Sequence, residues 1–424
     1  MSGYFYERFS TNTRDELQAK AMVMERGDEK AALVVCDLIG ISRSLSTQVR
    51  EAASKKTKIP AANIIIAATH THTGPLYAGG LRDFFHKRAE EKFDRDPAEG
   101  VAYPNILAER LVAVLVEAQR GLQPVYLEVG STMVTNLSFN RRYWMNDGRV
   151  VTNPGKTNAN VVGPAGPIDP QFGFVVAMSP KKDRVLGTFS SFALHPDTVG
   201  GTEYSADYPF YLEQSIRKLL GEDLVSLFGN STCGNINHVN VSDAKPQKGQ
   251  EEAERIGKAL GNAASSVLPG LKPVKSPTLR VGREVVTVPL HQFTAERVAN
   301  AKADMQKLGT GQTSFLEQVD TARIYHLQAQ GASSLQLEVQ AVCLGADTAI
   351  VGLPGEIFAE LGLAIKKASP FKNTFIVELC NDDIGYVPTR KAYEEGGYEP
   401  TNSSVKPGGG EMLVEAAIRL LKRL

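Results

Sequence analysis

The sequence predicts an α/β fold, with one domain over residues 1–424 in which a mixed β-sheet is flanked by helices. Three observations lead to this prediction. Short apolar runs alternate with amphipathic segments of helical period. Turn residues join several neighbouring runs into hairpins. Residues with reactive side chains follow one apolar run after another, which is where active sites of α/β proteins lie, at the carboxyl ends of strands.

Composition argues against several classes of function. The chain has 47 basic and 47 acidic side chains, so its net charge gives no electrostatic basis for binding nucleic acid or an anionic membrane. No apolar run approaches the roughly 18 residues that span a bilayer. The widely spaced Cys36, Cys233, Cys343 and Cys380 form no CxxC pair, and those beside apolar runs are expected to be small buried hydrophobes. Residues 1–5 lack the basic start and apolar core of a signal peptide.

The first 170 residues give clear strand and helix signals. A turn at Gly27–Lys30 predicts a hairpin, and Pro104 is placed to begin a helix. Residues 79–102 are charged and are expected to form a mobile excursion with His86 on the surface. The Gly-, Pro- and Asn-rich segment 145–170 is expected to be an ordered loop or flap. The predicted elements are strands 17–26, 31–38, 64–68 and 125–134, a helix from Ser42 or Ser44 to Lys56, and a helix over 105–120.

The rest of the chain continues the alternation. Turns at Pro180–Asp183 and Gly345–Asp347 predict two further hairpins. His291 and His326 are interpreted as structural or surface residues. The predicted strands are 172–178, 185–193, 225–229, 279–289, 335–344, 348–353 and 374–379. The predicted helices are 208–220, 250–268, 295–308, 314–328, Glu356 to about Lys367, and Gly410 or Glu411 to Leu424.

Reactive residues gather at the exits of the predicted strands. One such coincidence is ordinary, but five in one domain imply a shared cleft at one end of the sheet. The residues in question are His70 and His72 after strand 64–68, His195 after 185–193, the loop Cys233–His238 after 225–229, Glu356 after 348–353 and Tyr386 after 374–379.

This set of residues is suited to metal-assisted hydrolysis. Two histidines and a glutamate are a common ligand set for catalytic zinc that leaves room for a water. The metal lowers the pKa of that water and polarises a carbonyl. A further histidine beside the metal, such as His72, is suited to moving protons, and Arg141 to pairing with an anionic group or an oxyanion. The polar loop 230–240 offers backbone N–H groups for an oxyanion site.

Two other classes of protein compete with this interpretation. A serine hydrolase is disfavoured because no GxSxG elbow is present: Gly229-Asn230-Ser231 supplies the first half, but Cys233 replaces the second glycine. A sugar- or lipid-binding module without chemistry accounts for the Gly- and Asn-rich loops. It has no need of two histidines and a glutamate at strand ends.

Taken together, the motifs resemble the catalytic N-terminal domain of the neutral/alkaline, non-lysosomal ceramidase family. The resemblance extends over nearly the whole chain, and its most specific part is the His-Thr-His-(Thr/Ser)-Gly-Pro motif. The matching segments, in the family's order, are Ala68–Pro75, Asn140-Arg141, Ala193-Leu194-His195, Gly234–Asn237, Pro354-Gly355-Glu356, and Asn381-Asp382 to Tyr386 with Tyr398 twelve residues later.

The resemblance implies a site and a reaction. It implies one Zn²⁺ per chain, reaction-centre residues His72, Arg141 and Tyr398, and metal-bound water that attacks an N-acyl amide or a related ester or lactone. It also implies a small-molecule or lipid-like substrate and a secreted or periplasmic location. Asp197 is a further candidate, for orienting a ligand, and His238 for the site itself. The implied zinc ligands are His70, His195, Glu356 and Tyr386.

The chain departs from the family pattern in three ways. The family loop reads Gly-Asp-(Val/Ile)-Ser-Pro-Asn, and here Asn237 replaces the serine. An amide cannot act as a nucleophile, so the replacement favours a metal–water mechanism, with Asn237 lining the site, and means that the resemblance does not by itself assign ceramide as the substrate. We also expect neither the family's C-terminal β-sandwich nor its opening strand. The alternatives are a relative that acts on a sugar or another small ligand, and a metal-containing binding protein without turnover.

Overall fold

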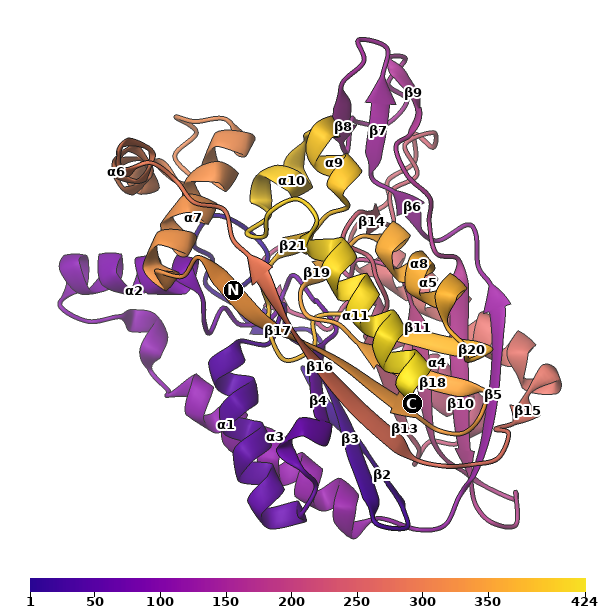
Figure 1. The fold of residues 1–424 in the computed structure, drawn as a ribbon. Coiled ribbons are helices and arrows are strands. Elements are labelled where there is room, and N and C mark those ends of the chain that lie inside the picture. Colours follow the sequence, from indigo (N-terminus) through magenta and orange to yellow (C-terminus); the bar gives the residue numbers. More distant parts are fainter.

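The computed structural model describes residues 1–424, and at its centre two β-layers pack face to face (Figure 1). One layer is a five-stranded sheet in the order β13-β11-β10-β5-β15, in which β11 and β13 are parallel and the other pairs antiparallel. Its strands are β5 (Tyr126–Met133), β10 (Gln171–Met178), β11 (Val185–Phe192), β13 (Val225–Asn230) and β15 (Lys272–Pro273).

The second layer consists of two mixed sheets that meet edge to edge. One has the order β2-β3-β4 and the other β16-β17-β18-β20. At their junction Ala67 bridges Cys380, and the Asn381 N–H donates to the Ile66 carbonyl at 2.7 Å. The strands are β2 (Ala19–Arg26), β3 (Glu29–Cys36), β4 (Ile64–Ala68), β16 (Arg280–Pro289), β17 (Ser334–Cys343), β18 (Thr348–Gly352) and β20 (Asn373–Val377). The sequence therefore predicts the mixed α/β class correctly, but the strands form several sheets rather than one.

Helices cover the outer faces of both layers, because each presents an apolar stripe to a sheet. In each case the buried cluster beneath the helices is continuous with the sheet. On the five-stranded sheet lie α4 (Tyr208–Leu220) and α5 (Gln250–Val267). On the three-stranded sheet lie α1 (Arg43–Thr57) and α3 (Tyr103–Arg120), and on the four-stranded sheet α8 (Ala359–Ala368) and α11 (Gly409–Arg423). Ser42 caps α1 as predicted, by accepting from the Leu45 N–H.

Two segments differ from the sequence prediction. Residues 79–102 are not a mobile excursion: they contain α2 (Gly80–Phe93), which buries Phe84 and Phe85 against Met305 and Leu308. The predicted flap over 145–170 is ordered. Together with the residues just before it, this segment forms a small sheet that projects from the body (Figure 1). It consists of β7 (Arg142–Met145), β8 (Val150–Thr152) and β9 (Val161–Pro164).

The remaining elements are short or peripheral. No helix combines the length and the apolar character needed to cross a membrane. All four cysteines are buried and unpaired, and the burial of Cys36, Cys343 and Cys380 agrees with their place beside apolar runs. These elements are α6 (Ala295–Asp304), α7 (Phe315–Gln330), α9 (Arg390–Glu395), α10 (Tyr398–Asn402), β1 (Asn12–Thr13), β6 (Phe139–Asn140), β12 (Glu203–Tyr204), β14 (Ile236–Asn237), β19 (Glu356–Ile357) and β21 (Tyr386–Val387), with 3₁₀ turns η1 (Ala61–Asn63), η2 (Pro97–Glu99), η3 (Leu268–Gly270) and η4 (Met305–Lys307).

Candidate metal centre

The loop after β4 places two histidine rings close together. The backbone of His70 is in the left-handed region (φ +75°), so the chain is not extended there. The two rings nevertheless meet edge to face, with centroids 4.9 Å apart between His70 and His72. His70 Nδ1 lies 2.6 Å from the Ile39 carbonyl and donates its proton there, which leaves Nε2 free to bind a ligand. A strained backbone at a reactive side chain is a common feature of functional sites.

Two further strand exits bring His195 and Glu356 to the same place. His195 follows β11, and its Nδ1 lies 3.2 Å from the Cys233 carbonyl, so its Nε2 is free as well. Glu356 does not begin a helix as predicted: it forms β19, whose partner in parallel register is Tyr386 of β21, and α8 begins at Ala359. A role of Glu356 as a helix cap is therefore excluded. The Tyr386 ring stacks on that of His195, with centroids 6.5 Å apart.

The donor atoms converge within hydrogen-bond distance of one another. His70 Nε2 lies 3.0 Å from His195 Nε2 and 3.3 Å from His72 Nε2. Glu356 Oε2 lies 3.2 Å from His70 Nε2 and 3.4 Å from His195 Nε2. His70, His72 and His195 thus form a group that is able to bind a metal ion. The structure brings His72 into the donor cluster itself, where it is placed to serve either as a neighbour or as a ligand.

These spacings fit a zinc ion. Ligand atoms about 2.0–2.1 Å from a tetrahedral zinc are separated from each other by about 3.3–3.4 Å. Glu356 Oε2 is buried and has no neighbour to pair with other than the imidazoles of the cluster, a position that is costly for a carboxylate unless a cation binds it. Imidazole nitrogens with one carboxylate are a donor set that catalytic zinc sites use. The residues present therefore fit the metal that the sequence analysis implies.

Burial and mutual charge set the protonation states of the cluster. Burial lowers the pKa of His70, but the Glu356 carboxylate outweighs that effect and raises it to about 9. Burial and the neighbouring His70 together lower the pKa of His72 to about 4. Burial, and then Arg141, lower the pKa of His195 well below its ordinary value. Two of the three imidazoles are therefore neutral at pH 7.

Arg141 lies beside the cluster within a buried ionic network. Its Nε donates to Glu399 Oε1 at 2.8 Å and its Nη2 to the Gly234 carbonyl at 2.8 Å. Its guanidinium carbon lies 5.3 Å from the ring centroid of Tyr386 and 5.8 Å from that of Tyr398. The structure thus brings Arg141, Tyr386 and Tyr398 together, and Tyr398 begins the short helix α10 rather than lying in a loop.

The neighbouring arginine, Arg142, is also buried. Arg142 is 2% exposed and donates to Glu395 at 2.9 Å, with Glu399 3.5 Å away. Its cation is neutralised by side chains from α9 and α10, which come from the far end of the chain. Arg142 therefore holds α9 and α10 against β7 and does not face water.

Backbone N–H groups of the loop after β13 are bonded to neighbouring segments and within the loop. The N–H groups of Cys233, Gly234 and Ile236 donate within the protein, so they are not free to form the oxyanion site that the sequence suggested. The Asn237 amide donates to Asn153 at 2.8 Å, and its oxygen accepts from the N–H of Val239. Both ends of the Asn237 side chain are therefore engaged in holding the loop.

Three further polar residues are placed by the structure. His238 Nδ1 lies 3.2 Å from Asp197, so Asp197 faces His238 rather than a predicted metal ligand. His86 is half-buried and not freely solvated: it lies 3.1 Å from Asp96, whose charge Arg82 already balances. Sequence analysis missed Glu378, which directly follows β20.

Glu378 ties two loops of the site together. It is fully buried and accepts from the N–H groups of Cys233 and Ile357 and from the Cys233 thiol. Burial raises the pKa of its carboxyl to about 8. In the sequence Glu378 lies in the apolar run of the predicted strand 374–379. No local pattern distinguishes it there from a glutamate that faces solvent.

Comparisons with known proteins define the fold. No protein-family model matches the chain, and no curated protein matches it in sequence. Neutral ceramidase from Pseudomonas aeruginosa matches in structure with a TM-score of 0.71 and 19% identity, covering 100% of this chain and 73% of that one. A ceramidase complexed with C2 matches with a TM-score of 0.72 at the same identity and coverage. The molecule is thus a mixed α/β protein with a donor cluster at its strand ends. Its fold is that of neutral ceramidase, which confirms the resemblance seen in the motifs.

Proposed function

We propose that this chain is a metal-dependent hydrolase, with one Zn²⁺ per chain, that cleaves an N-acyl amide or a related ester or lactone. The observation that supports this most strongly is the buried convergence of His70, His195 and Glu356 at zinc-ligand spacings. Tyr386, paired in register with Glu356, is the proposed fourth ligand. The likeness in fold to neutral ceramidase supports the choice of an amide.

The metal, when bound, polarises the scissile carbonyl and supplies an activated water. The protein's own residues have three tasks in this proposal. His72, which is neutral at pH 7, accepts a proton at Nε2 and returns it to the leaving group. Arg141, fixed by Glu399 and Gly234, pairs with negative charge on the carbonyl oxygen. The Tyr398 hydroxyl donates to the same oxygen.

The substrate is proposed to be a small or lipid-like amide other than ceramide itself. Asn237 stands where the resembling family has a serine, and its side chain is occupied by Asn153 and Val239. We therefore assign Asn237 to support of the loop. No nucleophile is proposed on the protein, since the reaction uses water.

The test is hydrolysis by Zn²⁺-loaded protein of a panel of N-acyl aminocoumarins and the matching hydroxycoumarin esters. We expect turnover of at least one amide and its loss in His195→Ala. His326→Ala is the matched control, because this half-buried histidine lies on α7, bonds to Gln330 and is not part of the donor cluster. Full metal occupancy with no hydrolysis across the panel would contradict the proposal and favour a binding protein.

A further inference from the structure

The segment Ser2–Arg8, which we call the strap, lies against both histidine loops of the candidate site. The N–H and the hydroxyl of Ser2 donate to the Gly74 carbonyl at 2.9 and 3.1 Å. The Arg8 guanidinium donates to the carbonyls of His72 at 2.8 Å and Gly201 at 2.6 Å, and also to that of Ser2. One guanidinium thus joins the strap to the loop after β4 and to the loop after β11.

The strap is in direct van der Waals contact with His72. Gly3 has φ +95°, and a Cβ added there would lie 2.7 Å from both the Cβ and the carbonyl oxygen of His72. Real Cβ atoms do not approach this closely, so only glycine fits at this position. The strap backbone is therefore part of the wall around His72.

Tyr4 extends this wall toward solvent. Its ring meets the ring of His72 edge to face, with centroids 6.4 Å apart, and the Arg8 guanidinium lies 4.1 Å from its centroid. The ring is held from two sides, yet Tyr4 is 37% exposed. An exposed aromatic surface is thus fixed directly beside a reaction-centre histidine.

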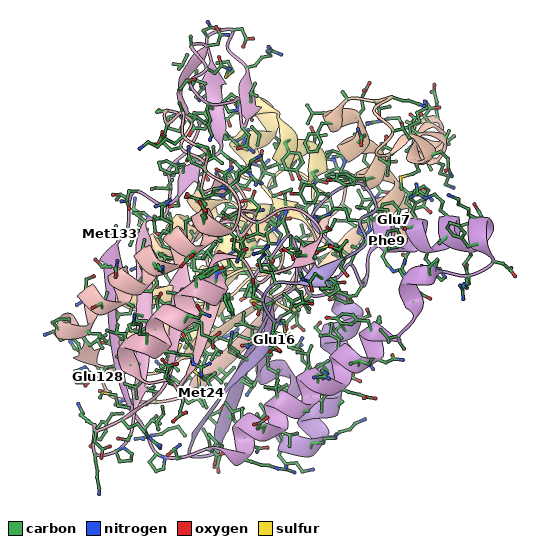
Figure 2. The ribbon with its side chains drawn as sticks, turned by 180° about the vertical axis from the view of Figure 1, so that it is seen from behind. Glu7, Phe9, Glu16, Met24, Glu128 and Met133 are labelled. Carbon is green, nitrogen blue, oxygen red and sulfur yellow. The ribbon has the colours of Figure 1, made fainter.

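On its other side the strap joins a series of aromatic rings that leads outward from the site. Phe5 packs on Phe315 at 5.9 Å, Phe315 on Tyr398 at 5.3 Å, and Tyr398 on Tyr386 at 5.3 Å between centroids. Phe315 is 56% exposed. Further along, Glu7 pairs with Arg88 at 2.9 Å, and Figure 2 shows Glu7 and Phe9 beside α2. The rim of the site near the strap is therefore aromatic.

We propose that Tyr4 is a specificity-determining residue that binds an apolar acyl chain of the substrate next to the scissile carbonyl. The inference rests on the proposed function and deepens it. The exposed rings of Tyr4 and Phe315 offer apolar surface, and the nearest cation, Arg8, already donates to three carbonyls and is not free to bind an anionic chain end. Burial of apolar surface against such rings favours longer acyl chains over short ones.

The test measures binding and does not need turnover. Zn²⁺-loaded wild-type protein, Tyr4→Ala and Tyr4→Leu are titrated calorimetrically with acetohydroxamate and octanohydroxamate, which offer a metal-binding head with a short or a long acyl chain. We expect Tyr4→Ala to weaken octanohydroxamate about tenfold more than acetohydroxamate, and Tyr4→Leu to weaken it less. Tyr126→Ala is the control: it is a 51% exposed tyrosine with a cation, Lys182, over its ring, but it lies at the end of the five-stranded sheet opposite to His195, and its replacement should leave the ratio of affinities unchanged.

Four results would overturn the proposal. Three of them are an unchanged ratio of affinities in both Tyr4 variants, an equal change in Tyr126→Ala, and no hydroxamate binding by metal-loaded wild-type protein. A loss of metal in Tyr4→Ala and Tyr4→Leu would also overturn it, because the strap would then be structural only. Failure of the proposed function appears separately, as hydroxamate binding without hydrolysis of any amide or ester.

Discussion

Replacing Glu399 by glutamine removes one negative charge from a fully buried position between two arginines. Glu399 is 0% exposed, accepts from Arg141 at 2.8 Å and from Thr152 at 2.8 Å, and lies 3.5 Å from Arg142. The amide has the size of the carboxylate: its oxygen can accept from the Arg141 Nε–H while its NH2 group donates to the Thr152 hydroxyl oxygen. The substitution Glu399→Gln therefore isolates the effect of the charge.

The structure sets the expected size of the loss. Arg142 keeps a second carboxylate, Glu395, at 2.9 Å, but Arg141 keeps only neutral partners, namely the new amide oxygen, the Gly234 carbonyl and two aromatic rings. Breaking a buried ion pair costs about 3–5 kcal/mol, because it leaves a desolvated charge without its partner. Since the amide keeps neutral hydrogen bonds, we expect the free energy of unfolding to fall by about 3 kcal/mol.

Urea denaturation at pH 7 measures this loss from the shift in midpoint at constant slope. The control is Asp147→Asn, which removes an equally close but exposed pair with Arg149, 2.6 Å apart, and should leave the midpoint unchanged. A loss under about 1 kcal/mol in Glu399→Gln would refute the reasoning, since surface pairs contribute that much at most. Arg141 would then not depend on this carboxylate for its position.

Three further outcomes are expected. His70→Ala should release the metal, whereas His72→Ala should keep it and lower turnover; measured metal content and rates distinguish the two, and equal metal loss would make His72 a ligand. Asn237→Ala should lower the free energy of unfolding by about 1–3 kcal/mol, because Asn153 and the Val239 N–H lose a buried partner, while bound metal is kept. A stability unchanged within error would contradict the supporting role of Asn237. Chelation should lower the thermal midpoint and added Zn²⁺ restore it, because an ion that binds only the folded state stabilises it; an unchanged midpoint would show that the ion does not bind there.

The sequence predicts the local elements and the strand exits well, because both depend on short-range patterns. The Ile-rich β4 and the hairpin of β2 and β3 follow directly from apolar period and turn residues. Reactive residues that follow several strands already imply one cleft. The sequence alone therefore groups His70, His195 and Glu356 in one site.

What the sequence misses depends on contacts between distant segments. The helix α2 has a weak apolar pattern and is stabilised by Phe84 and Phe85 against residues more than 200 positions later. The edge contact between Ile66 and Asn381 decides how two sheets join, and no local signal encodes it. Arg142 is a third example, because its buried partners lie on α9 and α10.

The strap illustrates the same limit at the site. Nothing in residues 2–8 marks them as part of a reaction centre, and their meaning comes from Gly3 lying against His72. The role of Glu378 also cannot be predicted from its own segment. Only the fold shows that its carboxylate accepts from both Cys233 and Ile357 and so connects their two loops.

The most direct test of the central claim is the metal content of protein purified without chelator, measured by mass spectrometry for the wild type, His195→Ala and the control His326→Ala. We predict one divalent ion per chain, with zinc preferred, in the wild type and in His326→Ala. We predict its loss in His195→Ala. Wild-type protein without a stoichiometric metal, or His195→Ala that retains it, would contradict the assignment of this cluster as a metal centre.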